Sequence, residues 1–328
     1  MIASTAQVTP CLSGTPEGTG PHPAHLSQAL SHFPPLTTTV PKEFVHRAAV
    51  AEVLLTSWAP RSGTEFRVTA QWPRCHSYFA PVDGRYDPLF AAETIRQIGA
   101  LLAHTGFDVP LGHKFLMWDL EFAVVPERLR IAGAPASLDI DVSCTEVDRR
   151  PGGALKGLRY EAVLRQDGQT VATGGASFTC TRPEVHDRLR RDRPRSDESP
   201  LPLTAPLPPQ HVGRTSPVDV VLSPIGEAGR WLLRADTRHP VLFDHPVDHV
   251  PGMVLLEAAR QAAHALLGHA PFPVSARSTF ERYAELDAPC MVEARQLPDG
   301  EGSLATVLVT ATQGGEQLFS STLTAACP

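Results

Sequence analysis

The loop that precedes Pro251-Gly252 concentrates groups that could transfer protons, because His245 and His249 each follow an aspartate. A histidine beside a carboxylate is the usual arrangement of a general base, so His245, Asp248 and His249 are candidate catalytic residues. The free amides of a helix start, that of Gly252 in particular, can hold a carbonyl oxygen or a developing oxyanion. Two histidines could instead bind a metal, or one could simply hydrogen-bond the loop. We predict no metal, since both histidines precede the helix and nothing in the sequence ensures i,i+4 helical geometry for them.

A second chemical motif, Glu-x-x-Arg-Gln, occurs twice at a spacing of 164 residues. The copies are Glu93, Arg96 and Gln97, and Glu257, Arg260 and Gln261. Residues three apart share one helix face, and a buried pair of opposite charges is costly unless it is fully hydrogen-bonded. The two glutamates are therefore candidate catalytic residues, and Arg96 and Arg260 are candidate substrate-binding residues. The alternative is an internal ion pair that only fixes the packing of the helix.

The loop before the first copy differs from the loop before the second. It runs from Cys75-His76 to Asp87 and has no paired histidines, so the two sites are expected to have diverged. A thiol nucleophile paired with His76 is disfavoured, because adjacent residues of an extended chain point apart. Arg85 could bind a phosphate or carboxylate, or could be a solvated loop residue.

The elements that carry these motifs also occur twice. Val45-His46-Arg47 followed by residues 51–55 matches Val212-Gly213-Arg214 followed by residues 218–222, at a spacing of 167. Two matches in the same order at nearly one spacing indicate a duplicated domain.

Each copy is predicted to contain two strands, one long helix and then a meander of about four strands. Strands are expected at 66–72, 116–124, 138–144, 160–164, 170–180, 231–235, 274–280, 291–297, 304–310 and 317–324, with hairpin turns at 166–169 and 313–316. In the strand 116–124 the alternation directs Leu116, Trp118, Leu120, Phe122 and Val124 to the core. The helices begin at Asp87-Pro88 and Pro251-Gly252, and the first ends before Gly106. Both are apolar on most faces and should be buried. A buried helix wrapped by an antiparallel sheet is the α+β hotdog fold, here predicted as a tandem, double hotdog.

Composition limits the function classes. The chain has 328 residues, of which 42% are hydrophobic and 20% charged, with a net charge of −6 and no apolar run that could span a membrane. We expect a cytoplasmic protein that binds neither nucleic acid nor membrane. Its six cysteines form neither a CxxC motif nor a metal-binding spacing. Many of the 32 prolines fall in two segments, a predicted disordered tail, 1–36, and a predicted Arg/Pro-rich solvated linker, 183–209. The tail precedes a hotdog domain at 37–182, and the linker separates it from a second hotdog domain at 210–328. The arginines of that linker could touch phosphates or an acidic partner.

The second helix start resembles the helix entry of hotdog 3-hydroxyacyl-[acyl-carrier-protein] dehydratases, but His245 lies two residues closer to the glycine than in that pattern. A closer resemblance, over about 40–328, is to the A-factor biosynthesis (AfsA-like) family of γ-butyrolactone synthases, with tandem hotdog domains. It is carried by VPKEFVHRAAVAEVLLTSW, DPLFAAETIRQIG and FDHPVDHVPGMVLLEAARQAA.

The resemblance implies transfer of a β-ketoacyl group from acyl carrier protein to dihydroxyacetone phosphate. Aldol condensation then gives a butenolide phosphate, the precursor of a γ-butyrolactone signal that controls secondary metabolism. We expect no cofactor. The residues proposed as active in the family match Glu93, Glu257 and Arg260 here, and Arg96 is the counterpart of Arg260 in the first half.

In paired hotdog domains the loop of one domain works with the helix glutamate of the other. This pairs His245, Asp248 and His249 with Glu93, and the 76–87 loop with Glu257. Gly252 would hold the thioester oxygen, and Arg96 or Arg260 the phosphate. A related furan or butenolide synthase, a dehydratase or thioesterase, and a non-catalytic acyl-binding module remain alternative functions. For the oligomeric state, a homodimer remains an alternative to a single chain that supplies both halves.

Overall fold

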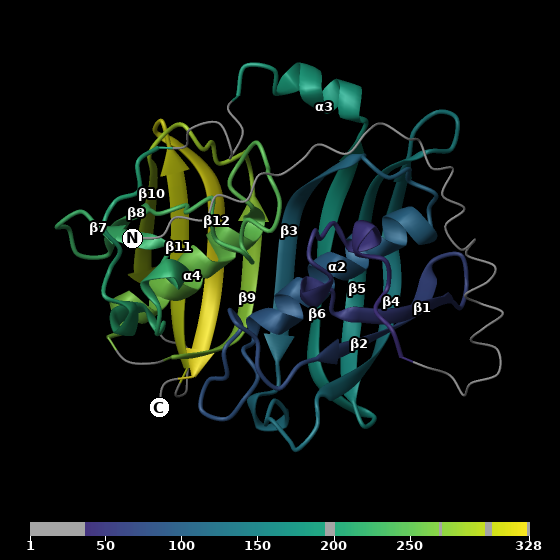
Figure 1. Ribbon diagram of the computed structural model, residues 1–328, viewed down its shortest axis with the longest axis horizontal. Coiled ribbons are helices and arrows are strands. Elements are labelled where there is room, and N and C mark those ends of the chain that lie inside the picture. The colour runs from purple at the N-terminus through teal and green to yellow at the C-terminus, as the bar shows by residue number, and fades with distance from the viewer. Residues whose placement is uncertain (1–36, 194–200, 269–270, 299–303, 327–328) are drawn as a thin grey trace, which may run out of the picture. The chain divides into compact units, whose positions relative to one another are not determined.

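The computed structural model describes residues 37–193, 201–268, 271–298 and 304–326. The predicted tail, 1–36, and part of the predicted linker, 194–200, lie outside these ranges. Two halves with the same element order follow one another along the chain (Figure 1). The first comprises β1 (Leu55–Pro60), β2 (Glu65–Trp72), α2 (Leu89–Thr105), β3 (Lys114–Val124), β4 (Ala136–Arg149), β5 (Leu155–Gln166) and β6 (Gln169–Thr181). The second comprises β7 (Leu222–Pro224), β8 (Arg230–Leu233), α4 (Gly252–Leu267), β9 (Phe272–Phe280), β10 (Cys290–Gln296), β11 (Leu304–Gln313) and β12 (Glu316–Ala326).

Short helices precede the strands of each half at equivalent places. They are η1 (Lys42–Val45) and η2 (Val50–Glu52) in the first half, and η4 (Pro209–Val212) and η5 (Pro217–Asp219) in the second, while η3 (Pro126–Arg128) follows β3. This repetition confirms the duplication read from the two spacings.

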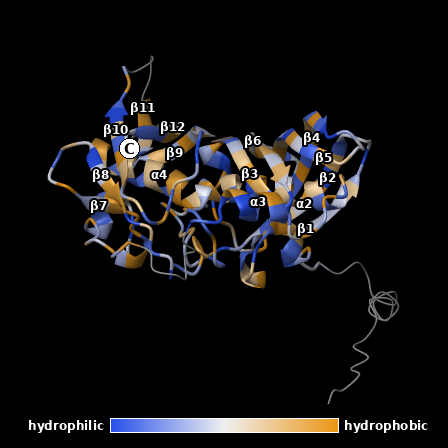
Figure 2. Cartoon of the chain, turned by 90° about the horizontal axis from the view of Figure 1, so that it is seen from above, coloured by the Kyte–Doolittle hydropathy of each residue, from blue (hydrophilic) through white to orange (hydrophobic). Residues whose placement is uncertain are grey.

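All strands join one twelve-stranded antiparallel sheet in the order β1-β2-β4-β5-β6-β3-β9-β12-β11-β10-β8-β7. Equivalent strands of the two halves follow in the same order from the two edges of the sheet, β1-β2-β4-β5-β6-β3 from one edge and β7-β8-β10-β11-β12-β9 from the other. The halves meet where β3 pairs with β9, and Glu121 lies opposite Arg277 there. Both long helices lie on the same side of this sheet (Figure 2). One correction concerns connectivity. Only the last three strands of each half form a meander, because β3 and β9 cross over to the far side of it.

The helix termini follow their sequence signals. Asp87 Oδ1 accepts a hydrogen bond from the amide of Leu89 at 2.9 Å and so caps the start of α2. Helix α2 ends at Gly106, where a Cβ atom would lie 2.7 Å from the Phe66 ring, so this position requires glycine. Gly268, with φ of 72°, ends α4 in the left-handed conformation that favours glycine.

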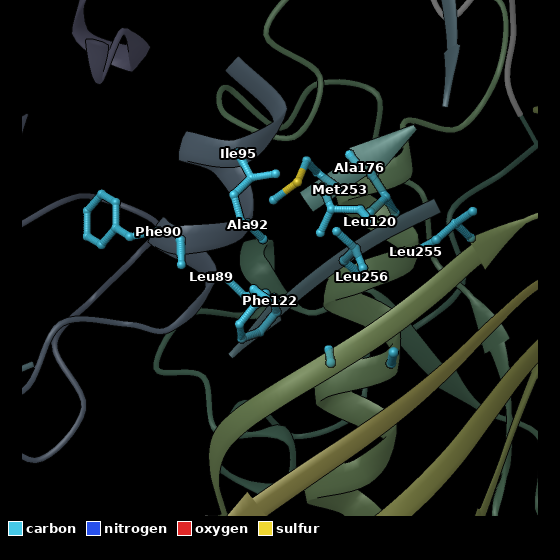
Figure 3. Packing of buried hydrophobic residues seen from close by; sticks show 14 of the residues in the cluster. Leu89, Phe90, Ala92, Ile95, Leu120, Phe122, Ala176, Met253, Leu255 and Leu256 are labelled. Atoms are coloured by element: carbon cyan, nitrogen blue, oxygen red, sulfur yellow. The ribbon is translucent and has the colours of Figure 1, made fainter. Parts of the chain in front are cut away.

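The apolar faces of both helices join a single hydrophobic core that includes residues of both halves. Figure 3 shows part of it, with α2 contributing Leu89 and Ile95, α4 contributing Met253 and Leu256, and β3 contributing Leu120. The N-terminal turns of the two helices, which carry Glu93 and Glu257, are thus anchored beside the central strand pair.

The predicted inward row of β3 is wrong at its start. The pairing of β3 with β6 shifts between Met117 and Asp119, and the bulge places Trp118 outward with 41% of its surface exposed. Phe115 and Met117 pack against the core instead, whereas Leu120, Phe122 and Val124 are buried as predicted. An inserted residue reverses the alternation on one side of a bulge, and no periodicity reveals it.

The predicted linker also differs in its first part from a solvated connector. Residues Pro183–Leu189 form a short helix, α3, and Arg190 directly after it is buried, with 9% of its surface exposed.

Candidate active site

The first Glu-x-x-Arg-Gln motif forms a buried ion cluster. Glu93 is 1% exposed. Arg96 binds both of its carboxylate oxygens, Nε to Oε2 at 2.9 Å and Nη2 to Oε1 at 2.7 Å. Gln97 Nε2 donates to Oε1 at 2.6 Å and to the carbonyl of Glu52 at 2.7 Å, while Gln97 Oε1 accepts from the amide of Leu54. The motif therefore ties α2 to the segment that leads into β1.

The second motif repeats this cluster around Glu257, whose surface is fully buried. Arg260 binds it in the same way, Nε to Oε2 at 2.9 Å and Nη2 to Oε1 at 2.6 Å. Gln261 Nε2 also donates to Glu257 and to the carbonyl of Asp219, and its Oε1 accepts from the amide of Val221. The polar residues of both helices thus occupy equivalent positions and make equivalent contacts.

Each cluster contains a second arginine that the sequence reasoning did not assign. Arg47 binds Glu93 through Nε at 3.0 Å and Nη2 at 2.7 Å, and Arg214 binds Glu257 through Nε at 2.8 Å. The available signal was that Arg47 and Arg214 match in the two duplicated strings that precede the strands. Those strings served only to establish the repeat.

The arginines determine the charge state of both glutamates. Burial alone would raise the pKa of Glu93, but Arg47 and Arg96 outweigh it and lower the pKa to about 2. Burial opposes ionisation of Glu257 in the same way, and Arg214 and Arg260 lower its pKa to about 2. Such carboxylates are weak bases at neutral pH, because efficient general bases titrate near the working pH. They act here as anions that hold guanidinium groups in place.

Each cluster is completed by the other half of the chain. Arg47 Nη1 donates to the carbonyl of Val241 at 3.1 Å, and Arg214 Nη1 donates to the carbonyl of Tyr78 at 2.6 Å. The Asp244 carboxylate accepts the amides of Ala48 and Ala49 beside the first cluster. The expected crosswise arrangement is therefore present in part: a segment of each half contacts the glutamate cluster of the other half through the upstream arginine.

His245 lies beside the first cluster as predicted. Its Nδ1 is 3.4 Å from Asp244 Oδ2, and its side chain is 45% exposed. Burial, together with the positive charges of Arg47 and Arg96, lowers the pKa of His245 more than Asp244 raises it. His245 is therefore a neutral imidazole near pH 7, able to accept a proton.

Asp248 and His249 take part in a different cluster, which corrects their predicted pairing with Glu93. Asp248 Oδ2 lies 2.8 Å from His186 Nε2 and accepts from Arg190 Nε at 3.1 Å, and its Oδ1 lies 2.7 Å from His249 Nδ1. Burial disfavours the Asp248 anion, but His249, Arg190 and His186 hold its pKa well below the usual value. This cluster ties α3 to the loop that precedes α4.

The two remaining predicted residues are Gly252 and Arg85. Gly252 is the first residue of α4, and a Cβ atom there would lie 3.1 Å from the ring of Phe280. Arg85 pairs through its backbone with Val82 and Arg130, and its guanidinium lies 5.3 Å from the ring centroid of Phe272, in the second half. Arg85 therefore bridges the halves rather than projecting into solvent.

One histidine pair near the first cluster was also missed. Nδ1 of His104 lies 2.6 Å from the carbonyl of Val109, which can only accept, so Nε2 of His104 must accept from Nε2 of His46 at 2.8 Å. Burial, with His104 and Arg96, lowers the pKa of His46 to about 3. In the second half the equivalent residue is Gly213, so the two halves differ here.

Comparison with known proteins shows the family of the chain. The model of the A-factor biosynthesis hotdog domain matches residues 28–182 and 196–328, one match for each half. The chain belongs to this family. The two matches confirm the tandem hotdog architecture expected from the resemblance.

Curated relatives match most of the chain. A 2-oxo-3-(phosphooxy)propyl 3-oxoalkanoate synthase of Streptomyces virginiae is 54% identical over 87% of this chain and 97% of its own length. A protein of the same name from Streptomyces coelicolor is 44% identical over 87% of this chain and 90% of its own.

Similar solved structures have low sequence identity. An acyl-ACP thioesterase from Bacteroides thetaiotaomicron matches with a TM-score of 0.49 and 10% identity, over 79% of this chain and 97% of that one. Among the described residues, no helix has the length and apolar character needed to cross a membrane.

Proposed function

We propose that this protein is an acyltransferase that joins a β-ketoacyl group to dihydroxyacetone phosphate, giving a 2-oxo-3-(phosphooxy)propyl 3-oxoalkanoate. The observation that carries the proposal is the 54% identity, over 97% of its length, to a relative that bears the name of this synthase. An aldol condensation within the ester then gives a butenolide phosphate. We infer that the product is a precursor of a γ-butyrolactone-type signalling molecule.

The acyl donor in this proposal is a β-ketoacyl thioester of acyl carrier protein. The two helices are apolar over most of their surface and lie against the sheet, which suits an acyl chain. Dihydroxyacetone phosphate and acyl carrier protein both occur in the cytoplasm, where we place the reaction.

The paired clusters support a role for arginine in binding the phosphorylated acceptor. Arg96 and Arg260 are each oriented by two bonds to an ionised glutamate. A guanidinium that is fixed in this way is pre-organised for an anionic or polar oxygen. We propose that His245 serves as a proton acceptor beside Glu93, and that Asp248 and His249 position the loop through α3.

The decisive experiment supplies purified protein with a β-ketoacyl acyl carrier protein and dihydroxyacetone phosphate, with products followed by mass spectrometry. We expect the transferred ester and the butenolide phosphate, in amounts that depend on both substrates. If folded protein yields neither compound, the synthase proposal is wrong. Appearance of free β-keto acid alone would indicate a thioesterase.

Replacing each central glutamate tests the clusters. Glu93→Gln and Glu257→Gln each remove the carboxylate that binds two largely buried guanidinium groups, so we expect each to lose about 3–5 kcal/mol of unfolding free energy. Both should lower the rate of butenolide phosphate formation, and Glu257→Gln should lower the transfer step itself, measured on the folded fraction at reduced temperature. Asp139→Asn, which removes an exposed partner of Arg67, is the control and should change neither. An unchanged transfer rate in both glutamine variants would show that the clusters take no part in the reaction.

A further inference from the structure

Three buried polar atoms beside Glu257 have no hydrogen-bond partner within the described residues. They are Nη2 of Arg214, the hydroxyl of Tyr78 and Oδ2 of Asp87. The residues are 7%, 1% and 1% exposed, respectively. Buried polar groups are almost always paired, because leaving one unpaired costs free energy without return. Three of them together point to a polar molecule that belongs there.

The residues that carry these three atoms lie close to one another and to Glu257, because the charges of Asp87, Arg214 and Glu257 all act on the Tyr78 hydroxyl. The Arg214 guanidinium lies 4.2 Å from the Tyr78 ring centroid, and Arg260 Nη1 lies 4.0 Å from Asp87 Oδ2. Arg214 and Arg260 both bind Glu257. Burial raises the pKa of Tyr78 well above its usual value, and the charges of Glu257, Arg214, Arg260 and Asp87 all act on its hydroxyl. Tyr78 and Asp87 come from the first half, and the others from the second.

Within the described residues, none of the side chains of the Glu93 cluster has a buried polar atom without a partner. Arg47 uses Nε and Nη2 on Glu93 and Nη1 on the carbonyl of Val241, so each of its nitrogens has a partner. Tyr78 corresponds to Val241, because their carbonyls accept from the equivalent Arg214 and Arg47, and the spacing of 164 matches Asp87 to Pro251. The side chains of Val241 and Pro251 carry no polar atom. The unpaired groups are thus a property of the second cluster and not of the fold.

We propose, on the basis of the proposed function, that this place binds the hydroxyketone end of dihydroxyacetone phosphate, and that the Glu257 cluster rather than the Glu93 cluster is where acyl transfer occurs. Asp87 Oδ2 accepts the hydrogen bond of the substrate hydroxyl, and Tyr78 and Arg214 Nη2 donate to the ketone oxygen. The charges of two arginines and two carboxylates cancel here, so the place favours the uncharged hydroxyketone end of the substrate over its phosphate dianion. In this proposal the phosphate lies away from Asp87 and Glu257.

Asp87 is also placed to take the hydroxyl proton. Its Oδ1 is held by the amide of Leu89 at the start of α2, which leaves Oδ2 for the substrate. As the hydroxyl oxygen bonds to the acyl carbon, the carbon–sulfur bond of the thioester breaks. The proton passes from the hydroxyl to Asp87 and then to the departing thiolate, giving a free thiol.

The test compares Tyr78→Phe and Asp87→Asn with Tyr86→Phe. The asparagine keeps an oxygen for the cap of α2 but removes the carboxylate. Tyr86 lies in the same loop and is equally buried, but its hydroxyl accepts from the amide of Ala136, so its loss is a structural control. Binding of dihydroxyacetone phosphate alone is measured by calorimetry, its KM and kcat by product formation, and folding by circular dichroism.

We expect Tyr78→Phe to weaken binding and raise KM about tenfold, the value of one hydrogen bond. Asp87→Asn should lower kcat at least about a hundredfold, as loss of a general base does, and Tyr86→Phe should bind as the wild type does. If Tyr78→Phe and Asp87→Asn bind and turn over the acceptor like the wild type, the three atoms hold only water and the inference is wrong. If the wild-type protein forms no ester but its binding of dihydroxyacetone phosphate still depends on Tyr78 and Asp87, the pocket is supported, while the transfer step and the proposed function fail.

Discussion

The two buried clusters have the same centre and different surroundings. Glu93 and Glu257 each bind a following arginine, a following glutamine and an upstream arginine. The loops that meet them share little: Val241 and Asp244 approach the first cluster, whereas Tyr78 and Asp87 approach the second. After duplication, the parts fixed by helix and sheet stayed equal and the loops diverged. Apart from the change of His46 to Gly213, the differences described between the two clusters lie in the side chains of these loops.

The largest effect expected concerns what the clusters share, their response to acid. Both glutamates have a folded pKa of about 2, below the ordinary value of 4.5. Between these values the unfolded chain binds more protons than the folded one, so stability rises with pH in this range. The contribution of both carboxylates is complete above about pH 4.5 and is lost as the pH falls toward 2.

Urea unfolding at a series of pH values measures this response. Glu93→Gln and Glu257→Gln should each flatten the acid limb by a similar amount. If only one of them does so, the two glutamates differ in charge state, and the two clusters are not electrostatically equivalent.

A smaller effect tests what holds the loop of the second half. Arg190 binds Asp248 and both oxygens of Glu285, and its guanidinium lies 4.3 Å from the ring of Tyr283. Arg190→Ala removes the guanidinium that binds two partly buried carboxylates, and leaves Asp248 with His186 and His249 and Glu285 with the more distant Arg193. We therefore expect a loss of about 3 kcal/mol in unfolding free energy. The neighbouring Arg191 is exposed, and Arg191→Ala should stay within about 0.5 kcal/mol. Equal losses for the two variants would mean that α3 does not anchor this loop.

The smallest expected effect on stability concerns Gly213, the counterpart of His46 in the second half. Gly213 has φ of 68°, and a Cβ atom there would lie 2.7 Å from Nδ1 of His264. Gly213→Ala should cost about 1–2 kcal/mol, and Gly268→Ala, which is equally left-handed but unobstructed, about 1 kcal/mol. Thermal unfolding of both variants gives the difference. A smaller loss at Gly213 than at Gly268 would show that His264 moves aside freely.

Much of the scaffold could be predicted because its signals are local or repeated. The caps at Asp87 and Gly106, the two hairpin turns and the twin Glu-x-x-Arg-Gln motifs are readable in single segments, and the repeat doubles the evidence for each. The crosswise meeting of loop and helix came from the resemblance, and the structure has it.

The parts that could not be predicted depend on distant contacts. Asp248 lies 58 residues from Arg190 in sequence, and Glu285 lies 95 residues from it. No spacing rule brings such partners together, so Asp248 and His249 were assigned to the wrong cluster. The bulge at Trp118 is set by pairing with β6, and the unpaired atoms of Tyr78, Asp87 and Arg214 are visible only once both halves are in contact.

The pairing of β3 with β9 has a consequence for assembly. A separate half would expose that strand as an open sheet edge, and two copies of the same half could then pair with each other. Such a pair of identical halves would lack either the Tyr78 and Asp87 loop or the Glu257 helix that this loop meets. The connection between the halves holds the correct partner at an effective concentration in the millimolar range, as short tethers do. It thereby selects the mixed pairing, and the activity of each molecule should not fall on dilution.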